Sequence, residues 1–302
     1  MAYELLATVS TSTTPSAAFY SNGSIWVAAL SSVYRIDPAT AAITATIGVT
    51  PAASGQFVED QYGYVWFMGV GRVLTRIDPS DNTTSTVTVF TSGTAVPSLS
   101  LASGDLWVQL QGISSGAASR VFRIDPSTFA VTDTDNAICG TSLCVFFVEQ
   151  GGSVWASKTT FLGMNILQVN PSTNTVTSTT NVSASVVSFV SAVYAYGYLW
   201  CATGNGLLRF NTSTLVGTFP TANGQQGVVA SNSNLYFDDY QDVYVLNLST
   251  LGETKIIDRT SGQLGLFNFD DRGNAWLPIV SGSNTLKYVI PAVGWVRGHA
   301  WG

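Results

Sequence analysis

Three carboxylates within five residues form the densest group of chemically active side chains in this sequence. They belong to the run Asp238, Asp239, Tyr240 and Asp242. Oxygen-rich loops of this kind can hold a calcium ion, but neither an EF-hand spacing nor a glycine-rich calcium repeat accompanies the run. We therefore expect an ordinary acidic turn and no cofactor. A structural divalent cation near Asp238, Asp239 and Asp242 is the open alternative.

The end of the sequence holds a second group of candidates. Residues 292–302 contain Trp295, Trp301 and His299, which is the only histidine in the chain. One interpretation is a C-terminal tail that folds over one face of the protein and covers apolar edges. The other is a docking peptide for a second chain, because aromatic residues are favoured anchors of interfaces.

Three cysteines form a third group of candidates. Cys139 and Cys144 bracket a four-residue loop, a spacing that permits a disulfide without requiring one. Cys201 follows Trp200 in an apolar stretch, so we expect it to be a small buried residue.

None of the common catalytic patterns is complete. A Ser-His-Asp arrangement would have to use His299, which has no surrounding motif. Glycoside hydrolysis needs two carboxylates across a cleft, and the sequence leaves that possibility open. Gly69-Val70-Gly71 precedes an expected strand and not a helix, so it is not a phosphate-binding loop.

The elements that must position these residues repeat along the chain at intervals of roughly 40 residues, a period typical of propeller blades. Each repeat reads as four short strands of alternating apolar and polar residues. In the second repeat they are expected at 56–60, 64–68, 73–77 and 85–90. Tyrosine replaces tryptophan in one repeat, and the equivalent residues are Trp26, Trp66, Trp107, Trp155, Trp200, Tyr236 and Trp276. We predict an all-β, seven-bladed β-propeller in which these aromatics pack between blades.

The two ends of the repeat region complement each other. Residues 5–9 look like a fourth strand without its first three, and the strands expected at 266–270, 275–278 and 285–290 lack a fourth. Pairing them would close the last four-stranded antiparallel blade with the N-terminal strand and remove open sheet edges. We therefore predict one propeller domain at 1–291, followed by the tail at 292–302. Pro291 is expected to interrupt the last strand.

An Arg-Ile-Asp-Pro phrase closes the third strand of several repeats. Asp accepts a hydrogen bond from the backbone two residues on, and Pro presets the next dihedral, so the phrase is a turn device. We expect its arginines to lie against neighbouring carbonyls or acids. The alternative is a functional arginine patch, and the residues concerned are Arg35, Arg76, Arg123 and Arg209.

One phrase resembles a known family. Tyr62-Gly63-Tyr64-Val65-Trp66-Phe67, followed by Arg76-Ile77-Asp78-Pro79, is similar to the blade repeat of streptogramin (virginiamycin B) lyase-like propellers. That resemblance implies a histidine and acidic residues that hold magnesium at the mouth of the ring and eliminate across an ester. No repeat of this chain carries a histidine, so we do not expect the lyase activity.

Composition restricts the partners. Charged residues are only 10% of the chain, against about 25% in average globular proteins. The net charge of -6 argues against nucleic acid and anionic lipid as partners. No apolar run is long enough for membrane insertion, and the first ten residues lack the pattern of a signal peptide. The low lysine content and the many hydroxyl side chains suit a protein outside the cell.

We therefore expect a non-catalytic binding or structural propeller, a phage virion protein of the tail or tail tip that acts in host-surface recognition or assembly. Its partner would be another protein chain, such as a virion component, or a cell-surface glycan. The alternative is a secreted lyase-type or glycosidase-type propeller enzyme that acts on a small molecule or glycan. Binding is expected at the links between strands on one face, namely Gln109 to Ser119, Asp133 to Leu143, Lys158 to Gly163, Asn181 to Ser188 and Asp238 to Gln241.

Overall fold

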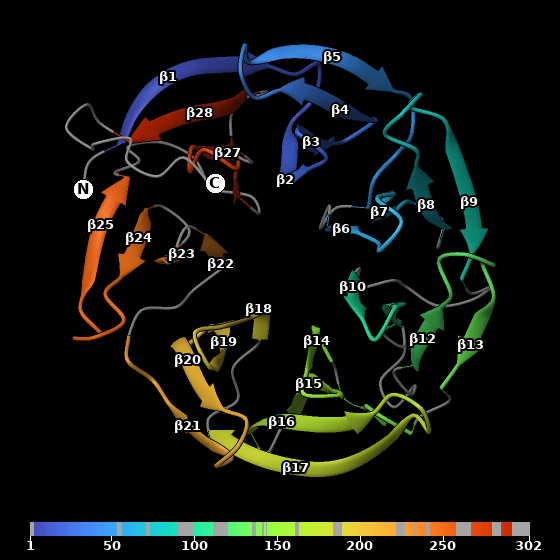
Figure 1. Cartoon of the computed structure of the whole chain (residues 1–302), viewed down its shortest axis with the longest axis vertical. Helices are drawn as coiled ribbons and strands as arrows, with labels where there is room; N and C mark the ends of the chain where they lie inside the picture. Colours follow the sequence, from blue (N-terminus) through green and yellow to red (C-terminus); the bar gives the residue numbers. More distant parts are fainter. Residues whose placement is uncertain are drawn as a thin grey trace, which may run out of the picture.

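The chain forms a ring of seven four-stranded antiparallel sheets in a computed structural model (Figure 1). The structure describes residues 3–52, 56–70, 73–89, 99–110, 120–134, 137–140, 142, 144–160, 163–183, 189–221, 227–231, 234–239, 242–257, 267–279 and 285–291. Every regular element in these ranges is a β-strand. The all-β, seven-bladed propeller predicted from the repeats is confirmed.

Consecutive strands build the first three blades, each running outward from the centre of the ring. Blade 1 contains β2 (Pro15–Ser21), β3 (Ser24–Ala29), β4 (Ser32–Asp37) and β5 (Ala42–Ile47). Blade 2 contains β6 (Phe57–Glu59), β7 (Val65–Met68), β8 (Val73–Ile77) and β9 (Thr84–Thr88). Blade 3 contains β10 (Leu99–Ala102), β11 (Asp105–Leu110), β12 (Arg120–Ile124) and β13 (Val131–Asp133).

The next three blades follow the same order. Blade 4 contains β14 (Phe147–Gln150), β15 (Ser153–Thr160), β16 (Gly163–Asn170) and β17 (Thr175–Ser183). Blade 5 contains β18 (Phe189–Ala195), β19 (Tyr198–Thr203), β20 (Gly206–Asn211) and β21 (Val216–Thr218). Blade 6 contains β22 (Gly227–Ser231), β23 (Asn234–Asp238), β24 (Val243–Leu246) and β25 (Glu253–Ile257).

Blade 7 closes the ring with strands from both ends of the chain. It contains β26 (Asn268–Phe269), β27 (Ala275–Ile279), β28 (Thr285–Pro291) and, on the outside, β1 (Tyr3–Ser10). The pairing of β1 with β28 runs from Tyr3 opposite Pro291 to Ser10 opposite Thr285, so the predicted closure is confirmed. The sequence predicted that Pro291 interrupts the sheet, and that prediction is wrong. Pro291 is the last residue of β28 and pairs with Tyr3.

Burial follows the position of a strand within its blade. Second strands such as β3 and β7 are buried along their whole length, whereas the outermost strand β9 alternates between exposed and half-buried residues. Trp107 is fully buried and stacks on Phe147 of the next blade, with ring centroids 5.1 Å apart. Tyr236 takes the same place between blades 6 and 7, where its ring centroid lies 4.2 Å from that of Phe269. The recurring aromatics therefore pack between blades, as predicted.

The two ends of the ring differ in the links that they carry. We call the end with the tight turns between first and second strands the turn face, and the opposite end, where second strands connect to third strands and blades connect to each other, the loop face. On the turn face, Trp26 Nε1 donates to the carbonyl oxygen of Ser21 at 3.3 Å. In blade 2 the indole of Trp66 donates instead to the Asp60 carboxylate at 2.6 Å. The indoles thus hold the turns in place.

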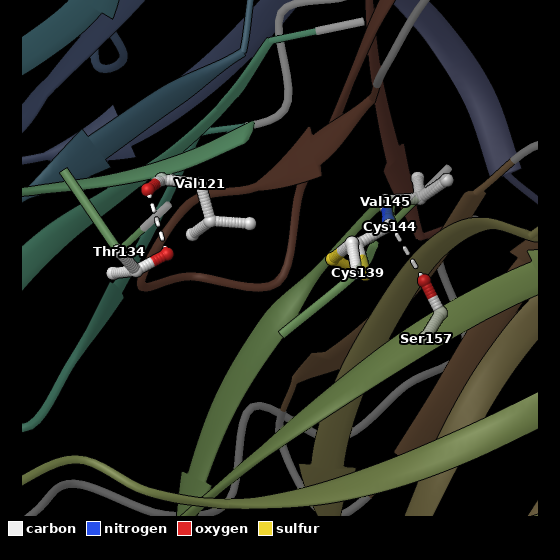
Figure 2. The surroundings of a disulfide bond; sticks show 6 residues. All are labelled: Val121, Thr134, Cys139, Cys144, Val145 and Ser157. Carbon is white, nitrogen blue, oxygen red and sulfur yellow. Dashed lines mark hydrogen bonds between the residues drawn. A yellow bond between two sulfur atoms is a disulfide. The ribbon is translucent and has the colours of Figure 1, made fainter. Parts of the chain in front are cut away.

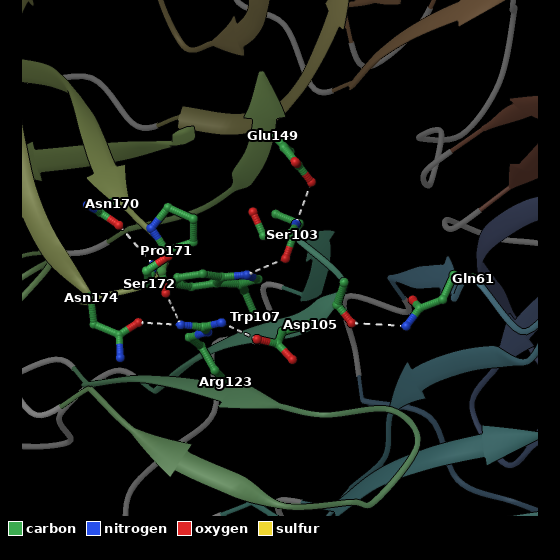
Figure 3. Close-up of polar contacts among 12 residues, drawn as sticks. Gln61, Ser103, Asp105, Trp107, Arg123, Glu149, Asn170, Pro171, Ser172 and Asn174 are labelled. Carbon is green, nitrogen blue, oxygen red and sulfur yellow. Dashed lines mark hydrogen bonds and ion pairs between the residues drawn. The ribbon is translucent and has the colours of Figure 1, made fainter. Parts of the chain in front are cut away.

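Arginines of the third strands join neighbouring blades on the turn face. Arg35 lies over the Trp26 ring at 5.2 Å and donates to the carbonyl oxygen of Pro79 in blade 2 at 2.6 Å. Arg123 pairs with Asp105 and reaches the Pro171 carbonyl in blade 4, as Figure 3 shows. Both side chains take the structural role expected from the repeated phrase, so they do not form a free cationic patch.

Candidate functional site

The loop face is elaborated on one side of the ring. Second and third strands are joined by residues 30–31 in blade 1 and 204–205 in blade 5, but by residues 111–119 in blade 3. The longest connection between blades is also attached to blade 3, at residues 134–146 before β14. Residues 111–119 lie outside the described residues. The sector of blade 3 and its junction with blade 4 is therefore the part of the ring that departs most from the repeat.

A disulfide lies inside the connection 134–146, which we call the braced link. Cys139 and Cys144 are bonded, with their Cα atoms 6.0 Å apart (Figure 2). The link is tied to both blades, since Thr134 Oγ1 donates to the Val121 carbonyl at 2.8 Å and Val145 N donates to Ser157 Oγ at 2.8 Å. These contacts fix both ends of the link on the loop face.

The braced link also packs against the hydrophobic core between blades 3 and 4. Both sulfur-bearing residues are almost fully buried and belong to a core cluster with Trp107, Val121 and Phe147. A Cβ at Gly140 would lie 3.9 Å from Lys158 Nζ. The amine of β15 therefore reaches the outer side of the link and brings a cation to this sector.

Gln109 is an unusual residue beneath the same sector. Its side chain is fully buried, and among the described residues neither its amide nitrogen nor its amide oxygen has a hydrogen-bond partner. Buried amides are normally paired, because an unmade hydrogen bond costs free energy. The position two residues after the second-strand aromatic holds an apolar residue in blades 1, 2, 5 and 7 and a polar one, Ser157 or Asp238, in blades 4 and 6. Comparing the repeats at this position would have marked Gln109, Ser157 and Asp238 together as polar residues where the other blades are apolar.

The acidic run is divided among local contacts. Asp239 accepts hydrogen bonds from Asp242 N at 3.0 Å and from the Tyr244 hydroxyl at 2.8 Å. Asp242 pairs with Lys255 at 3.0 Å, and Asp238 is 1% exposed at the end of β23. Burial raises the pKa of Tyr244, and the hydrogen bond to Asp239 raises it further.

Within the described ranges no three His, Cys, Asp or Glu side chains are placed to hold a metal ion. Tyr240, Trp295, His299 and Trp301 lie outside those ranges. Of the predicted site residues, the structure thus brings together Asp239 and Asp242 and, separately, the two cysteines. Cys201 is buried, as expected, and burial raises the pKa of its thiol.

The centre of the ring contains a cavity of about 460 Å³. The first strands of blades 2 to 5 line it, mainly with apolar side chains. Glu149 is the acidic residue of this lining, and its carboxylate accepts a hydrogen bond from Ser103 N on the turn face (Figure 3). The lining includes Val58, Leu101, Val148, Glu149, Val193 and Tyr194.

Ring closure between blades 1 and 7 involves a titratable pair. Tyr20 of β2 donates to the carboxylate of Asp271, and burial together with that hydrogen bond raises the pKa of Tyr20 to about 12. The phenol is therefore a neutral donor at physiological pH. It belongs to the closure of the ring and carries no sign of acid or base chemistry.

Among the described residues there is no helix whose length and hydropathy would let it cross a bilayer.

Comparison with known proteins places the fold. Virginiamycin B lyase from Staphylococcus aureus superposes with a TM-score of 0.76 at 15% identity, over 96% of this chain and 99% of the lyase. The Cps50 (Swd1) β-propeller domain of Myceliophteria thermophila superposes with a TM-score of 0.75 at 8% identity, over 95% and 99% of the two chains.

A third similar structure is the extracellular domain of a one component system from B. thetaiotaomicron, with a TM-score of 0.68 at 12% identity, over 95% of this chain and 40% of that chain. Neither a protein-family model nor a curated protein matches the sequence. The chain is thus a seven-bladed propeller whose fold is shared by streptogramin B lyases and by other propeller domains.

Proposed function

We propose that the chain is a binding propeller that recognises its target with the loop face of blade 3 and its junction with blade 4. The observation that carries this proposal is the braced link, which a disulfide and hydrogen bonds to two blades hold in place beside the longest link within a blade. Variable loops on a rigid scaffold are where binding commonly resides. The turn face, by contrast, consists of repeated contacts that connect one blade to the next.

The chemistry of the chain favours binding over catalysis. One lyase with this fold is described as a catalytically inactive histidine-to-alanine variant with quinupristin. The only histidine of the present chain is His299, outside all seven blades. No blade therefore supplies a histidine for elimination chemistry of that kind.

The target that suits this sector is a polar surface. The link 111–119 contains three serines, two glycines and a glutamine. The link 134–146 adds Asp135, Asn136, two threonines and a serine among apolar residues, and Lys158 adds one cation. Such side chains provide adaptable hydrogen bonds to sugars or to another protein chain. A role on the surface of a phage virion, at the tail or tail tip, fits this chemistry together with the low lysine content. Recognition of a host-surface glycan or assembly with virion components would follow from it.

A loop exchange tests the proposal without disturbing the ring. Leu110 pairs with Arg120 across the long link of blade 3, and Ala29 pairs with Ser32 across the two-residue link of blade 1. Replacing residues 111–119 by Leu-Ser therefore preserves the strand register. The matched control is Tyr62→Ala, which removes an exposed side chain from the turn face.

The purified full chain, the loop exchange, Lys158→Ala and the control Tyr62→Ala would be screened against a glycan panel, bacterial cell-wall preparations and phage structural proteins. We expect the loop exchange, and to a smaller extent Lys158→Ala, to weaken retention on the target at least tenfold. Tyr62→Ala should bind as the parent does. Equal binding by the loop exchange, or loss of binding by Tyr62→Ala alone, would refute the assignment of the site.

A further inference from the structure

We propose that the turn-face end of the central cavity is a second binding site, which takes a small organic cation with an apolar body, such as an arylalkylammonium ion. Its anionic anchor is Glu149, and its apolar walls come from the first strands of blades 2 to 5. The proposal goes beyond the function assigned to the loop face and is independent of it, because the two sites use different residues.

The cavity has the size and the walls to hold the body of such a ligand. Its volume of about 460 Å³ lies within the range of roughly 300–1,000 Å³ of pockets that hold small ligands. Val58, Leu101 and Val193 come from three different blades, so apolar side chains surround a bound molecule from several directions. Removing an apolar body from water against them is favourable. Tyr194 adds an aromatic ring, whose face attracts a cation.

Negative charge gathers at the turn-face end of these walls. Glu149 pairs with Val154, and Glu59 pairs with Val65, in each case the residue before the tryptophan of the second strand. The two carboxylates therefore stand at the same level of the innermost strands, in blades 2 and 4. Within the described ranges no lysine or arginine forms an ion pair with either of them. An ammonium ion would be attracted to this end of the cavity, and an anion would be repelled.

The Glu149 carboxylate is exposed but held in position. One of its oxygens accepts the hydrogen bond from Ser103 N, which belongs to the neighbouring blade 3 (Figure 3). The other oxygen has no hydrogen bond to the part of the chain that the structure describes, and it can accept one from a ligand. Since the carboxylate is already fixed, little side-chain freedom is lost when a ligand binds.

The second strand of the same blade provides a reporter for the cavity. In blades 1, 3 and 5 the indole N–H donates to a carbonyl oxygen of its turn. Trp155 of blade 4 is buried, and its N–H has no acceptor among the described residues. It belongs to a core cluster against which Val148 and Tyr194 of the cavity wall pack. A ligand in the cavity would therefore touch the side chains that surround this indole.

A series of probes with the same aromatic ring and different charge tests the site. The probes are phenethylammonium, the neutral phenethyl alcohol and the anionic hydrocinnamate, each titrated against the full chain by ligand-observed NMR near neutral pH. Glu149→Gln removes the charge but keeps an acceptor for Ser103 N. The matched control Glu253→Gln removes an exposed carboxylate from the outermost strand of blade 6.

We expect the parent to bind the cation at least about fivefold more tightly than the alcohol, as a charge-assisted hydrogen bond requires, and to bind the anion more weakly than the alcohol. Glu149→Gln should bind the cation no better than the alcohol, and Glu253→Gln should bind it as the parent does. Absence of binding, equal affinity for all three probes, or equal losses in the two variants would overturn the proposal.

Indole N–H signals in the proton–nitrogen NMR spectrum locate the bound cation. Trp155→Phe and Trp276→Phe assign the two signals that matter. Saturation with phenethylammonium should shift the Trp155 signal and leave that of Trp276, which lies in the core between blades 7 and 1. A shift of Trp276 without one of Trp155 would place the cation elsewhere and overturn the proposal. The loop exchange at 111–119 should bind the cation as the parent does, so this site and the loop-face site can fail separately.

Discussion

Opening the disulfide of the braced link should destabilise the protein by an amount that the structure lets us calculate. Cys139 and Cys144 are separated by 5 positions. Closing a loop of that size removes roughly 7 cal/mol/K of entropy from the unfolded chain, which corresponds to about 2 kcal/mol at 25 °C. The free energy of unfolding should therefore fall by about 2 kcal/mol when the bond is reduced. Reduction leaves both sulfur atoms in the core, so it isolates the loop-closure contribution.

The assay is urea unfolding of the parent protein with and without a reducing agent, followed by tryptophan fluorescence. The double variant Cys139→Ala, Cys144→Ala is the control. It should be at least as unstable as the reduced parent, because it also removes buried side-chain volume, and it should not respond to the reducing agent. A change below about 0.5 kcal/mol in the parent, or an equal response in the double variant, would refute the reasoning.

The same bond should matter for binding. Reduction frees the middle of the braced link, while the contacts of Thr134 and Val145 still hold its ends. We therefore expect faster amide hydrogen exchange between residues 137 and 144 and weaker target binding under conditions where the ring stays folded. Unchanged exchange in this segment would show that the disulfide does not brace it.

Three further predictions concern single residues. Asp60→Ala should lower the free energy of unfolding by about 2–4 kcal/mol in urea denaturation, because the Asp60 carboxylate holds the buried Trp66 indole and two turn amides; Asp60→Asn, which keeps an acceptor, should cost less, and equal losses would contradict the hydrogen-bond account. Gln109→Met, which copies the buried Met68 of blade 2, should raise the melting temperature by removing an unpaired buried amide; a lower melting temperature would mean that the amide has a partner. Hydrogen bonds from the Ser127 hydroxyl and backbone lower the pKa of Asp125 to about 2. The stability that this carboxylate contributes is therefore present above its unfolded pKa of about 3.9 and is lost as the pH falls toward 2. Urea unfolding between pH 5 and pH 2 should show a smaller acid-induced loss of stability for Asp125→Ala than for the parent, and identical pH profiles would exclude this contribution.

The sequence predicted the ring because blade packing is a local and repeated demand. Each blade needs an aromatic on its second strand to fill the space against its neighbour, so Trp26 and its equivalents recur and reveal the number of blades. Closure could be inferred for the same reason, since residues 5–9 match the fourth strands of other repeats. The role of the arginines followed from the turn phrase that surrounds them.

The candidate site was predicted less well, because its features depend on contacts between distant segments. The expected loops Lys158 to Gly163 and Asn181 to Ser188 overlap strands, since β15 extends to Thr160 and β17 to Ser183. Spacing alone left the disulfide open, whereas the structure shows it formed within the link between blades 3 and 4. Gln109 passed unnoticed, because a single polar residue in a strand has no meaning until its burial is known.

The most direct test of the central claim is amide hydrogen exchange of the full chain with and without the cell-wall fraction, glycan or virion protein that retains it in the binding screen. The account predicts protection in residues 111–119 and 134–146 and around Lys158, with unchanged exchange in the turns of the opposite face, such as 60–64 and 195–198. Protection confined to those turns, or spread equally over all seven blades, would contradict the assignment of recognition to the loop face of blade 3 and its junction with blade 4.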